Sequence, residues 1–265
     1  MINEILSRLP QDHPWSSRIH YYDCIGSTND RAKELALQGA PEGTVILADR
    51  QSAGRGRMGR SFQSPGGMGV YMSVILRPQC RPSDLMHLTC ATAVAMCDAI
   101  RQSTGLEAGI KWTNDLVFER KKLGGILTEL SLAPNGTVSH AIIGIGINCC
   151  QQPEDFSEDI RSIAASLSMV TGKAVSRSAV AAAMINALCV MSDTLLSQKD
   201  MIMKTYRRCC VTLGQDISLV RGSGVRHGKA LDVDPDGGLV VEFSDGKRET
   251  VTSGEVSVRG MYGYV

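Results

Sequence analysis

The chain has 265 residues, enough for one large domain or for one large and one small domain. Hydrophobic residues make up 43% of it, which allows an ordinary packed core and excludes an intrinsically disordered chain. The formal net charge of +1 gives no global reason to expect a polyanion or a membrane surface as partner, and no apolar run approaches the roughly 20 residues of a membrane-spanning helix.

Nine cysteines raise the question of disulfides or a metal site. The sequence has no C-x-x-C pair and no set of Cys and His residues at zinc-ligand spacing. The number is odd, and the first ten residues carry charge and lack the apolar stretch of a signal peptide. We therefore expect reduced, mostly buried thiols that act as small hydrophobic side chains in a cytoplasmic protein.

The first part of the chain predicts helices and strands separated by one irregular segment. Ser27 or Thr28 can cap the first helix, and Gly39 is placed to end it. The strands are short runs rich in β-branched residues, whereas the segment between them is rich in Gly, Arg and Ser. In chain order we expect a helix over 27–39, a strand over 44–48, a loop over 51–69, a strand over 70–76 and a helix from Ser83 to about Gln102.

The second part predicts a sheet, two helices and a separate small domain. Four short strands follow one another without helices between them, which favours an antiparallel or mixed sheet. After Leu213, short strands alternate with turn signals, as is typical of a small β-barrel. We therefore predict an α+β fold with a larger domain over 1–213 and a C-terminal barrel over 214–265. The expected elements of the larger domain are strands over 109–112, 115–119, 125–131 and 141–147 and helices over 178–197 and 200–210.

The strongest local motif is Q-S-A-G-R-G-R-M-G-R at 51–60, in which glycines alternate with arginines. Glycine lets backbone N–H groups approach an anion closely, and Arg55, Arg57 and Arg60 add donors for phosphate or carboxylate. The spacing is that of neither a P-loop nor a dinucleotide-binding turn. Two other interpretations stay open at this point: a solvated basic loop and an RNA-binding Arg/Gly patch.

A second motif, K-W-T-N-D-L, occupies 111–116. Lys111 at a strand end beside Trp112 can present a positive charge in a cleft of low dielectric constant, where it would stabilise charge on a transferring phosphoryl or carboxylate group. Asn114 and Asp115 supply oxygen ligands that can hold a substrate group or Mg²⁺. A plain strand–turn–strand with an Asx turn is the alternative.

Two further segments, K-L-G-G-I-L-T-E at 122–129 and G-I-G-I-N at 144–148, carry glycines inside strand patterns. Glycine weakens a strand, so its presence indicates that a ligand or another backbone must approach closely. Each segment alone is a weak signal.

Together and in this order, these segments resemble the catalytic domain of class I biotin protein ligases. The resemblance runs from Ser27 to Asn148 through S-T-N, Q-x-A-G-R-G-R-x-G-R, K-W-x-N-D-L, K-L-G-G-I-L-x-E and G-I-G-I-N. It continues more loosely into the C-terminal barrel, which resembles the SH3-like domain of that family. It implies a class II synthetase-like catalytic domain and an AMP-forming enzyme that makes biotinyl-AMP from biotin and ATP and transfers biotin to a lysine of a carrier protein.

The resemblance implies a biotin site and two catalytic residues. The arginine-rich loop matches the one that closes over biotin and its adenylate. Lys111 matches a lysine that contacts the biotin carboxylate and the α-phosphate, so Lys111 and Arg57 are the expected catalytic residues. The full set expected at biotin is Ser27, Thr28, Asn29, Gln51, Arg55, Gly56, Arg57 and Lys111.

The same resemblance implies a nucleotide site. Many members have Trp at the position of Phe62, which is associated with adenine packing, and many have Pro at the position of Thr113. Neither difference removes a chemical group that the reaction needs. Mg²⁺ is expected to arrive with ATP near Asp115, and no fixed protein metal site is expected. The residues expected at ATP or the adenylate are Arg55, Arg57, Arg60, Phe62, Lys111, Asn114 and Asn148.

The implied partner is a biotin carboxyl carrier protein, or the corresponding domain of a biotin-dependent carboxylase, and the implied state is a monomer or homodimer without nucleic-acid or membrane partners. A biotin-operon repressor of this family would need a winged-helix domain before Ser27, where 26 residues stand. A lipoate or octanoyl ligase of the same fold is the alternative function. An RNA-binding module is a more distant one, because aromatic residues make up 5% of the chain and do not interleave with the loop.

Overall fold

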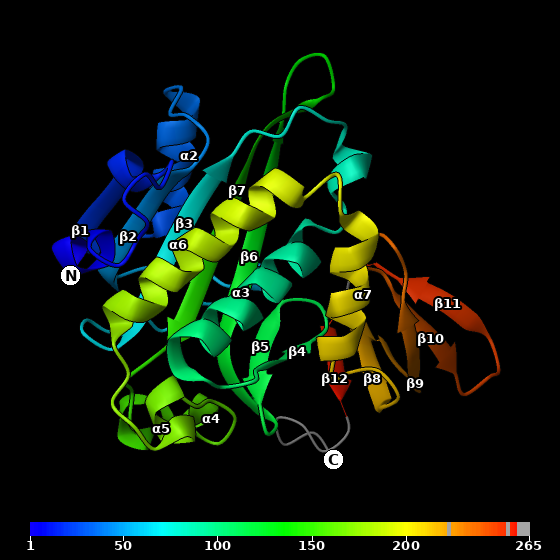
Figure 1. The fold of residues 1–265 in the computed structure, drawn as a ribbon. Helices are drawn as coiled ribbons and strands as arrows, with labels where there is room; N and C mark the ends of the chain where they lie inside the picture. Colours follow the sequence, from blue (N-terminus) through cyan, green and yellow to red (C-terminus); the bar gives the residue numbers. More distant parts are fainter. Residues whose placement is uncertain (222–223, 253–254, 259–265) are drawn as a thin grey trace.

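The computed structural model of the protein describes residues 1–221, 224–252 and 255–258, which form two β-sheets with helices around the larger one (Figure 1). In the larger sheet the first two strands are parallel and all other neighbours are antiparallel, so the sheet is mixed, as predicted. Its strands lie in the order β1 (Ile19–Ile25), β2 (Thr44–Gln51), β3 (Gly69–Leu76), β7 (Val138–Asn148), β6 (Lys121–Leu132), β5 (Asp115–Phe118) and β4 (Gly109–Lys111).

The central strands of this sheet are buried on both faces. Every residue of β3 is buried, as are nearly all residues of β7, which explains why both sequences are almost continuously apolar instead of alternating. The register places Gly125 of β6 opposite Gly146 of β7, and Gly146 opposite Tyr71 of β3. Side chains of alternate residues in a strand point to the same face, so the glycines leave one face of the sheet locally bare.

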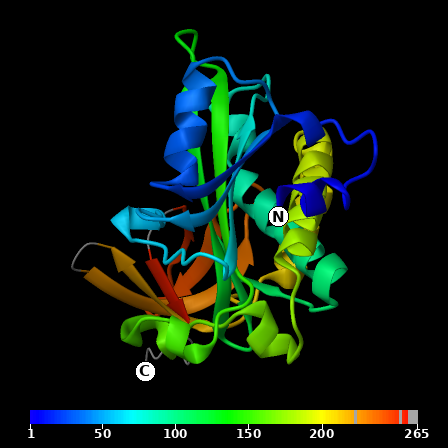
Figure 2. The same ribbon diagram turned by 90° about the vertical axis from the view of Figure 1, so that its left-hand side faces the viewer.

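Helices cover the two faces of the large sheet unequally. Helices α3 and α6 cross one face, and α2 lies against the other, as Figure 2 shows from the side. Ala32 and Ala36 of α2 pack on Ile46, Ile75 and Ile142 from three neighbouring strands. The helices are α1 (Ile2–Leu6), α2 (Thr28–Leu37), α3 (Leu88–Thr104), α4 (Glu158–Arg161), α5 (Leu167–Thr171), α6 (Arg177–Thr194) and α7 (Lys199–Cys209).

The helix predicted from Ser83 to about Gln102 is divided in two. Pro82–Leu85 forms a short 3-10 helix, and α3 begins only at Leu88, with His87 as its N-cap. Gly105, with φ of 76°, ends α3 in the left-handed conformation that glycine adopts without strain. His87 is fully buried, with its ring Nε2 2.9 Å from the carbonyl of Leu195.

The smaller sheet forms the C-terminal domain. All its strand pairs are antiparallel, and it begins at Asp216, two residues after the predicted boundary. Trp112 Nε1 donates to the carbonyl of Gly237 at 2.8 Å in a buried contact, and Arg207 Nε donates to the carbonyl of Val233 at 2.7 Å in a partly buried one, so both bonds join the two domains. The strands lie in the order β11 (Arg248–Val251), β10 (Leu239–Phe243), β9 (Gly224–Val233), β8 (Asp216–Arg221) and β12 (Glu255–Val258).

Strand β1 and the short helices were not predicted from the sequence. β1 reads I-H-Y-Y-D-C-I and lies at the edge of the sheet, where its exposure does not alternate cleanly between residues. Helices α1, α4 and α5 have five residues or fewer and depend on tertiary packing instead of a periodic pattern. Among the described residues, no helix is long and apolar enough to span a membrane.

Candidate active site

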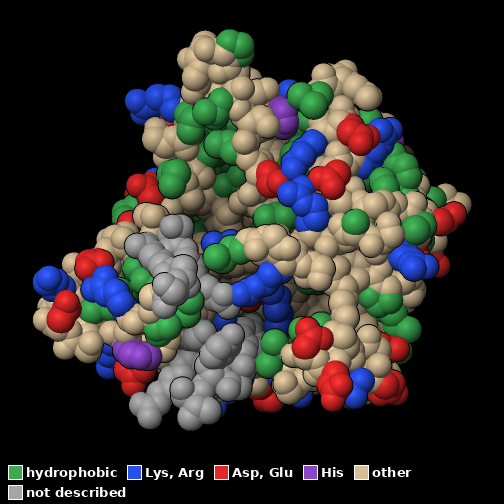
Figure 3. Space-filling view, turned by 180° about the vertical axis from the view of Figure 1, so that it is seen from behind, with side chains coloured by type: hydrophobic (Ala, Val, Ile, Leu, Met, Phe, Trp, Pro, Cys, Tyr) green, Lys and Arg blue, Asp and Glu red, His purple; other side chains and the backbone are tan. Residues whose placement is uncertain are grey.

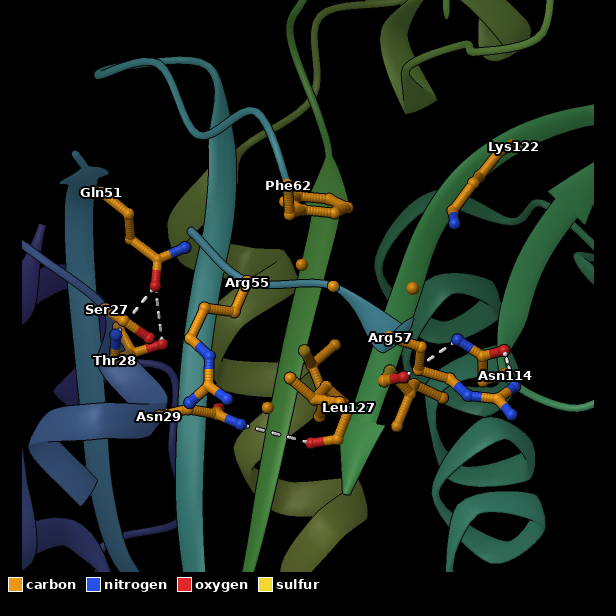
Figure 4. Close-up of a pocket in the computed structure, with 16 residues that line it drawn as sticks. Ser27, Thr28, Asn29, Gln51, Arg55, Arg57, Phe62, Asn114, Lys122 and Leu127 are labelled. Carbon is orange, nitrogen blue, oxygen red and sulfur yellow. Dashed lines mark hydrogen bonds between the residues drawn. The ribbon is translucent and has the colours of Figure 1, made fainter. Parts of the chain in front are cut away.

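A pocket opens on the face of the large sheet that carries α2, beneath the arginine-rich loop (Figure 4). It holds about 480 Å³ of empty space, including the part open to solvent. Figure 3 looks onto this face, which is hollowed near its centre, with Lys and Arg side chains around the hollow. The pocket is lined by Ser27, Thr28, Asn29, Gln51, Arg55, Gly56, Arg57, Phe62, Asn114, Lys122, Gly125, Ile126, Leu127, Gly144, Ile145 and Gly146.

One end of the pocket is a set of polar groups in fixed positions. The backbone N–H and the hydroxyl of Thr28 both donate to Gln51 Oε1, at 2.8 and 3.0 Å. Gln51 Nε2 donates in turn to the hydroxyl of Ser64 at 2.8 Å, so the orientation of the Gln51 amide is determined. Ser27 caps α2 and is itself buried. The residues predicted from the S-T-N motif and Gln51 therefore do meet at one place.

Asn29 forms part of the pocket wall. Its Oδ1 accepts from the hydroxyl of Ser73 at 2.6 Å, and its Nδ2 donates to Glu129 Oε2 at 2.8 Å. A methyl group on Gly144 would lie 2.0 Å from Asn29 Oδ1, so the first glycine of G-I-G-I-N leaves the space that Asn29 fills. Both amide ends of Asn29 are bonded within the protein, which indicates a role in shaping the wall.

The arginine-rich loop is a small hairpin that projects over the pocket. Phe62 N–H donates to the carbonyl of Gly54 at 2.9 Å, and Gly56 N–H donates to that of Arg60 at 2.7 Å. A methyl group on Gly54 would lie 2.4 Å from the carbonyl oxygen of Phe62, so this glycine permits the close approach of the two arms. At the tip, Met58 has φ of 57°.

The two arginines of the loop that reach the pocket are held on opposite sides of it. Arg55 donates to Asp30 Oδ1 at 2.6 Å and to Glu129 Oε1 at 3.3 Å, on the side of α2. Arg57 donates to Asn114 Oδ1 at 2.7 Å, on the side of β5. The Asn114 amide is fixed because its Nδ2 donates to the carbonyl of Ile126 at 3.0 Å. Figure 4 shows this separation of the two guanidinium groups.

Glu129 joins three segments around the pocket. Burial alone would raise the pKa of Glu129, but hydrogen bonds from Lys33 and Asn29, with the charges of Lys33 and Arg55, lower that pKa overall. Lys33 Nζ lies 2.6 Å from the carboxylate. The carboxylate therefore stays ionised and ties α2 and the loop to β6. In the sequence, Glu129 stands out only as the last residue of the K-L-G-G-I-L-T-E motif.

The lysine that lines the pocket is Lys122, and not Lys111. Lys111 is 7% exposed on the edge strand β4 and does not line the pocket. Lys122 lines it, with its Nζ 2.7 Å from Asp115 Oδ1. Lys111 belongs to the K-W-T-N-D-L motif and Lys122 to the K-L-G-G-I-L-T-E motif. The glycines of the second motif predict a close approach of a ligand or backbone, whereas its lysine carries no separate prediction. The pairing of β5 with β6 brings Lys122 beside Asp115 and Gly125, and no local pattern shows that pairing.

A second pocket adjoins the first, and the two share Phe62 and Lys122. It holds about 1140 Å³ of empty space, including open solvent, between the loop and α4. Arg60 and Asn148, expected at a nucleotide, line this second pocket and not the first. Asn148 is held by its bond to the carbonyl of Ala165 at 3.1 Å. A methyl group on Gly146 would lie 2.4 Å from the Phe62 ring, so the absence of a side chain at Gly146 leaves room for this ring.

The acidic residue expected near Mg²⁺ does not form a fixed metal site. Asp115 Oδ1 pairs with Lys122, and the neighbouring Asn114 Oδ1 accepts from Arg57, so both oxygens already face cationic groups. Within residues 1–221, 224–252 and 255–258, no group of three or more His, Cys, Asp and Glu side chains could hold a metal ion. The oxygens of Asp115 and Asn114 that face Lys122 and Arg57 therefore do not form a cation site as they stand.

Residues 21–148 match the Biotin/lipoate A/B protein ligase family, and residues 212–259 match the Biotin protein ligase C terminal domain. The "Bifunctional ligase/repressor BirA" of Bacillus subtilis (strain 168) is 39% identical over 229 residues, which are 85% of this chain and 70% of that protein. The chain belongs to the biotin protein ligase family. The resemblance seen in the motifs is thereby confirmed.

Two further members show how far the family likeness extends. The "Biotin--[acetyl-CoA-carboxylase] ligase" of Mycobacterium tuberculosis is 28% identical over 237 residues, covering 87% of this chain and 85% of that enzyme. The biotin protein ligase from Aquifex aeolicus, solved in complex with biotin and ATP, superposes with a TM-score of 0.76 at 28% identity and covers 91% of this chain and 98% of that one. Both domains of this chain therefore follow the fold of the biotin protein ligase family.

The close contact between Gly144 and Asn29 allows a test of whether β7 tolerates a side chain at this position. We expect Gly144→Ala to lower the free energy of unfolding by about 1–3 kcal/mol, because its methyl group overlaps a side chain fixed by Ser73 and Glu129. Gly26→Ala is the matched control, since a methyl group there meets nothing within 4 Å. Urea unfolding of both variants measures the difference. Equal stability of the two variants would show that Asn29 moves aside without cost.

Proposed function

We propose that this protein makes biotinyl-AMP from biotin and ATP and then transfers biotin to a lysine of a biotin carboxyl carrier protein. The observation that supports this most directly is the junction of the two pockets at Phe62 and Lys122. One pocket ends in fixed polar groups suited to a small organic acid, and the other carries Arg60, Phe62 and Asn148, three of the residues expected at a nucleotide. A reaction that joins an acid to a nucleotide needs such adjoining sites.

The polar end of the first pocket suits the ureido ring of biotin. Ser27, Thr28 and Gln51 place hydroxyl and amide groups there, and the hydrogen bonds between Thr28 and Gln51 fix these two side chains before a ligand arrives. Leu127 and Ile145 line the path toward the loop with apolar side chains. In this placement the biotin carboxylate lies between Arg57 and Lys122, beside the second pocket.

The chemistry of the first step needs positive charge at this junction. An oxygen of the biotin carboxylate attacks the α-phosphorus of ATP, an O–P bond forms, and the bond from that phosphorus to pyrophosphate breaks. Two anions must approach each other, so preorganised cations lower the barrier. Arg57 and Lys122 are each held by a neighbour, Asn114 and Asp115 respectively, and therefore do not need to be ordered during the reaction. We assign to Lys122 the role first expected for Lys111.

The product of this step is a mixed anhydride that water destroys. The hairpin loop lies over the pocket through Arg55 and Arg57, so it can shield the anhydride until the carrier arrives. In the second step the lysine amine attacks the acyl carbon and a C–N bond forms. The C–O bond to the phosphate breaks, AMP leaves with the electron pair, and the nitrogen loses a proton to water. Mg²⁺ is proposed to enter with the ATP phosphates.

Ligand specificity tests the proposed function and separates it from that of a lipoate or octanoyl ligase of the same fold. We expect biotin to bind more tightly than lipoate or octanoate by about a hundredfold or more. Lipoate and octanoate have no ureido ring, so they would leave the polar groups at this end of the pocket without hydrogen-bond partners. Isothermal titration with the three acids measures this. Biotin-dependent exchange of pyrophosphate into ATP, measured in parallel, reports the first step. Equal affinity for lipoate would reject biotin as the substrate.

The assignment of the lysine is tested by a pair of substitutions. We expect Lys122→Gln to lower biotin-dependent pyrophosphate exchange by about a hundredfold or more, the scale of one lost preorganised donor. Lys111→Gln removes the same charge from outside the pocket and should have a much smaller effect. Circular dichroism spectra of both variants, compared with that of the unaltered protein, serve as the control for folding. A larger loss for Lys111→Gln would return the catalytic role to Lys111.

Retention of the adenylate is tested at Arg57. We expect Arg57→Gly to release biotinyl-AMP, because it removes a charge-assisted hydrogen bond worth about 1.5–3 kcal/mol and loosens the loop. Dissociation should accelerate by roughly ten- to a hundredfold. The escaping anhydride would acylate exposed lysines of a bystander such as albumin, detected as biotin on albumin after incubation with biotin and ATP. An inactive variant, or one that remains selective for its carrier, would contradict the retention role.

A further inference from the structure

The second pocket contains a buried amide, that of Gln151, with one end unpaired. Gln151 follows the end of β7, lines this pocket and is 1% exposed. Its Nε2 donates to Asn148 Oδ1 at 3.2 Å, whereas its Oε1 has no hydrogen-bond partner among the described residues. Burial of an unpaired acceptor is unfavourable, and an apolar side chain of similar size would fill the same space without this cost. Packing alone therefore does not explain a glutamine at this position.

The backbone around Gln151 is held in place from two directions. The hydroxyl of Ser166, a fully buried residue, donates to the carbonyl of Gln151 at 2.7 Å. The N–H of the preceding residue, Ala165, donates to the carbonyl of Lys122 at 2.9 Å, so this segment is anchored to the start of β6. The amides of Gln151 and Asn148 therefore lie in a rigid part of the pocket wall.

The neighbouring groups determine which end of the Asn148 amide donates and which end accepts. The carbonyl of Ala165 can only accept, so the group that faces it at 3.1 Å must be Asn148 Nδ2. Asn148 Oδ1 then faces Gln151, where only an N–H can meet it favourably. A reversed Asn148 amide would place oxygen against the Ala165 carbonyl and Nδ2 against the Gln151 N–H. Asn148 is thus held in one orientation from both ends.

The Asn148 amide still has one acceptor and one donor for a ligand in the second pocket, which it lines. Its Oδ1 has a second lone pair, and its Nδ2 has a second hydrogen. An amide with an acceptor beside a donor pairs with adenine, which presents its 6-amino group next to an unprotonated ring nitrogen. A purine with oxygen at position 6 would place an acceptor against Asn148 Oδ1 instead. The orientation of this amide therefore determines which purine the pocket accepts.

We propose that Gln151 is a positioning residue that makes the nucleotide site specific for a 6-aminopurine, because it fixes the orientation of the Asn148 amide. The inference rests on the proposed function, since it takes the second pocket as the site of ATP. Gln151 is buried beneath the pocket surface and acts through Asn148, without touching the base. If the Gln151 N–H is removed, Asn148 Oδ1 loses its partner and the amide is free to rotate. A rotating amide no longer distinguishes an amino group from an oxygen at position 6.

Biotin-dependent pyrophosphate exchange with two nucleotides tests this assignment. The unaltered protein should prefer ATP to inosine triphosphate, which has oxygen at position 6, by about tenfold or more in kcat/KM. We expect Gln151→Met, which keeps the length of the side chain and removes its N–H, to lower this preference to about threefold or less. Gln151→Leu should do the same and serves as the second variant if Gln151→Met does not fold. Gln102→Met, at an exposed residue of α3, is the control and should leave the preference unchanged.

A double substitution shows whether Gln151 acts through Asn148. We expect Asn148→Ala to lower the preference for ATP as well, and Gln151→Met to lower it no further in that background. A role in packing alone would reduce exchange with both nucleotides in equal proportion, and the resulting unchanged preference would overturn the inference. A further loss of preference in the Asn148→Ala background, or no preference in the unaltered protein, would also overturn it. Absence of biotin-dependent exchange with either nucleotide in the unaltered protein would instead overturn the proposed function.

Discussion

The site depends on the absence of side chains along one face of the central strands. Gly144 and Gly146 lie two residues apart on β7, so both face α2 and the loop, and Gly125 extends the bare strip onto β6. Asn29 fills the space at one glycine, and the Phe62 ring fills the space at the other. Any larger residue at either position would displace the wall or the ring. The pocket occupies space that larger side chains on β6 and β7 would fill, and α2 and the hairpin loop enclose it.

The cationic groups around this pocket are already ordered by the protein. Arg55 lies against Asp30 and Glu129, Arg57 against Asn114, and Lys122 against Asp115. The partners come from α2, β5 and β6, so the positions of the charges depend on the whole sheet. Order of this kind matters for catalysis because charges that need not reorganise stabilise a transition state more than mobile charges do. It also explains why an arginine-rich loop can be specific for one reaction and is not merely a basic surface.

The two domains meet close to residues that line the first pocket. Trp112 belongs to the motif that supplies Asn114 and Asp115, and its indole N–H bonds the backbone of Gly237 in the C-terminal domain. A displacement of the small domain would therefore reach the residues that hold Arg57 and Lys122. This link connects the C-terminal domain physically to the motif that borders the pocket.

The sequence by itself determined the mixed α+β fold, the small C-terminal sheet and most residues of the pocket. These features could be predicted because hydrophobic runs, turn residues and the order of motifs are local properties of the sequence. In the S-T-N and arginine-loop motifs, the residue types themselves also indicate the chemistry. The edge strand β1 could not be predicted, since its sequence lacks a clear alternation of apolar and polar residues. Tertiary structure alone shows that Lys122 lines the pocket and Lys111 does not, because the pairing of β5 with β6 places Lys122 beside Asp115 and leaves Lys111 at the sheet edge. It also decided the role of Glu129, whose three partners lie up to 100 residues away in the chain. Contacts over such distances are set by strand register and helix packing, which no short segment of sequence encodes.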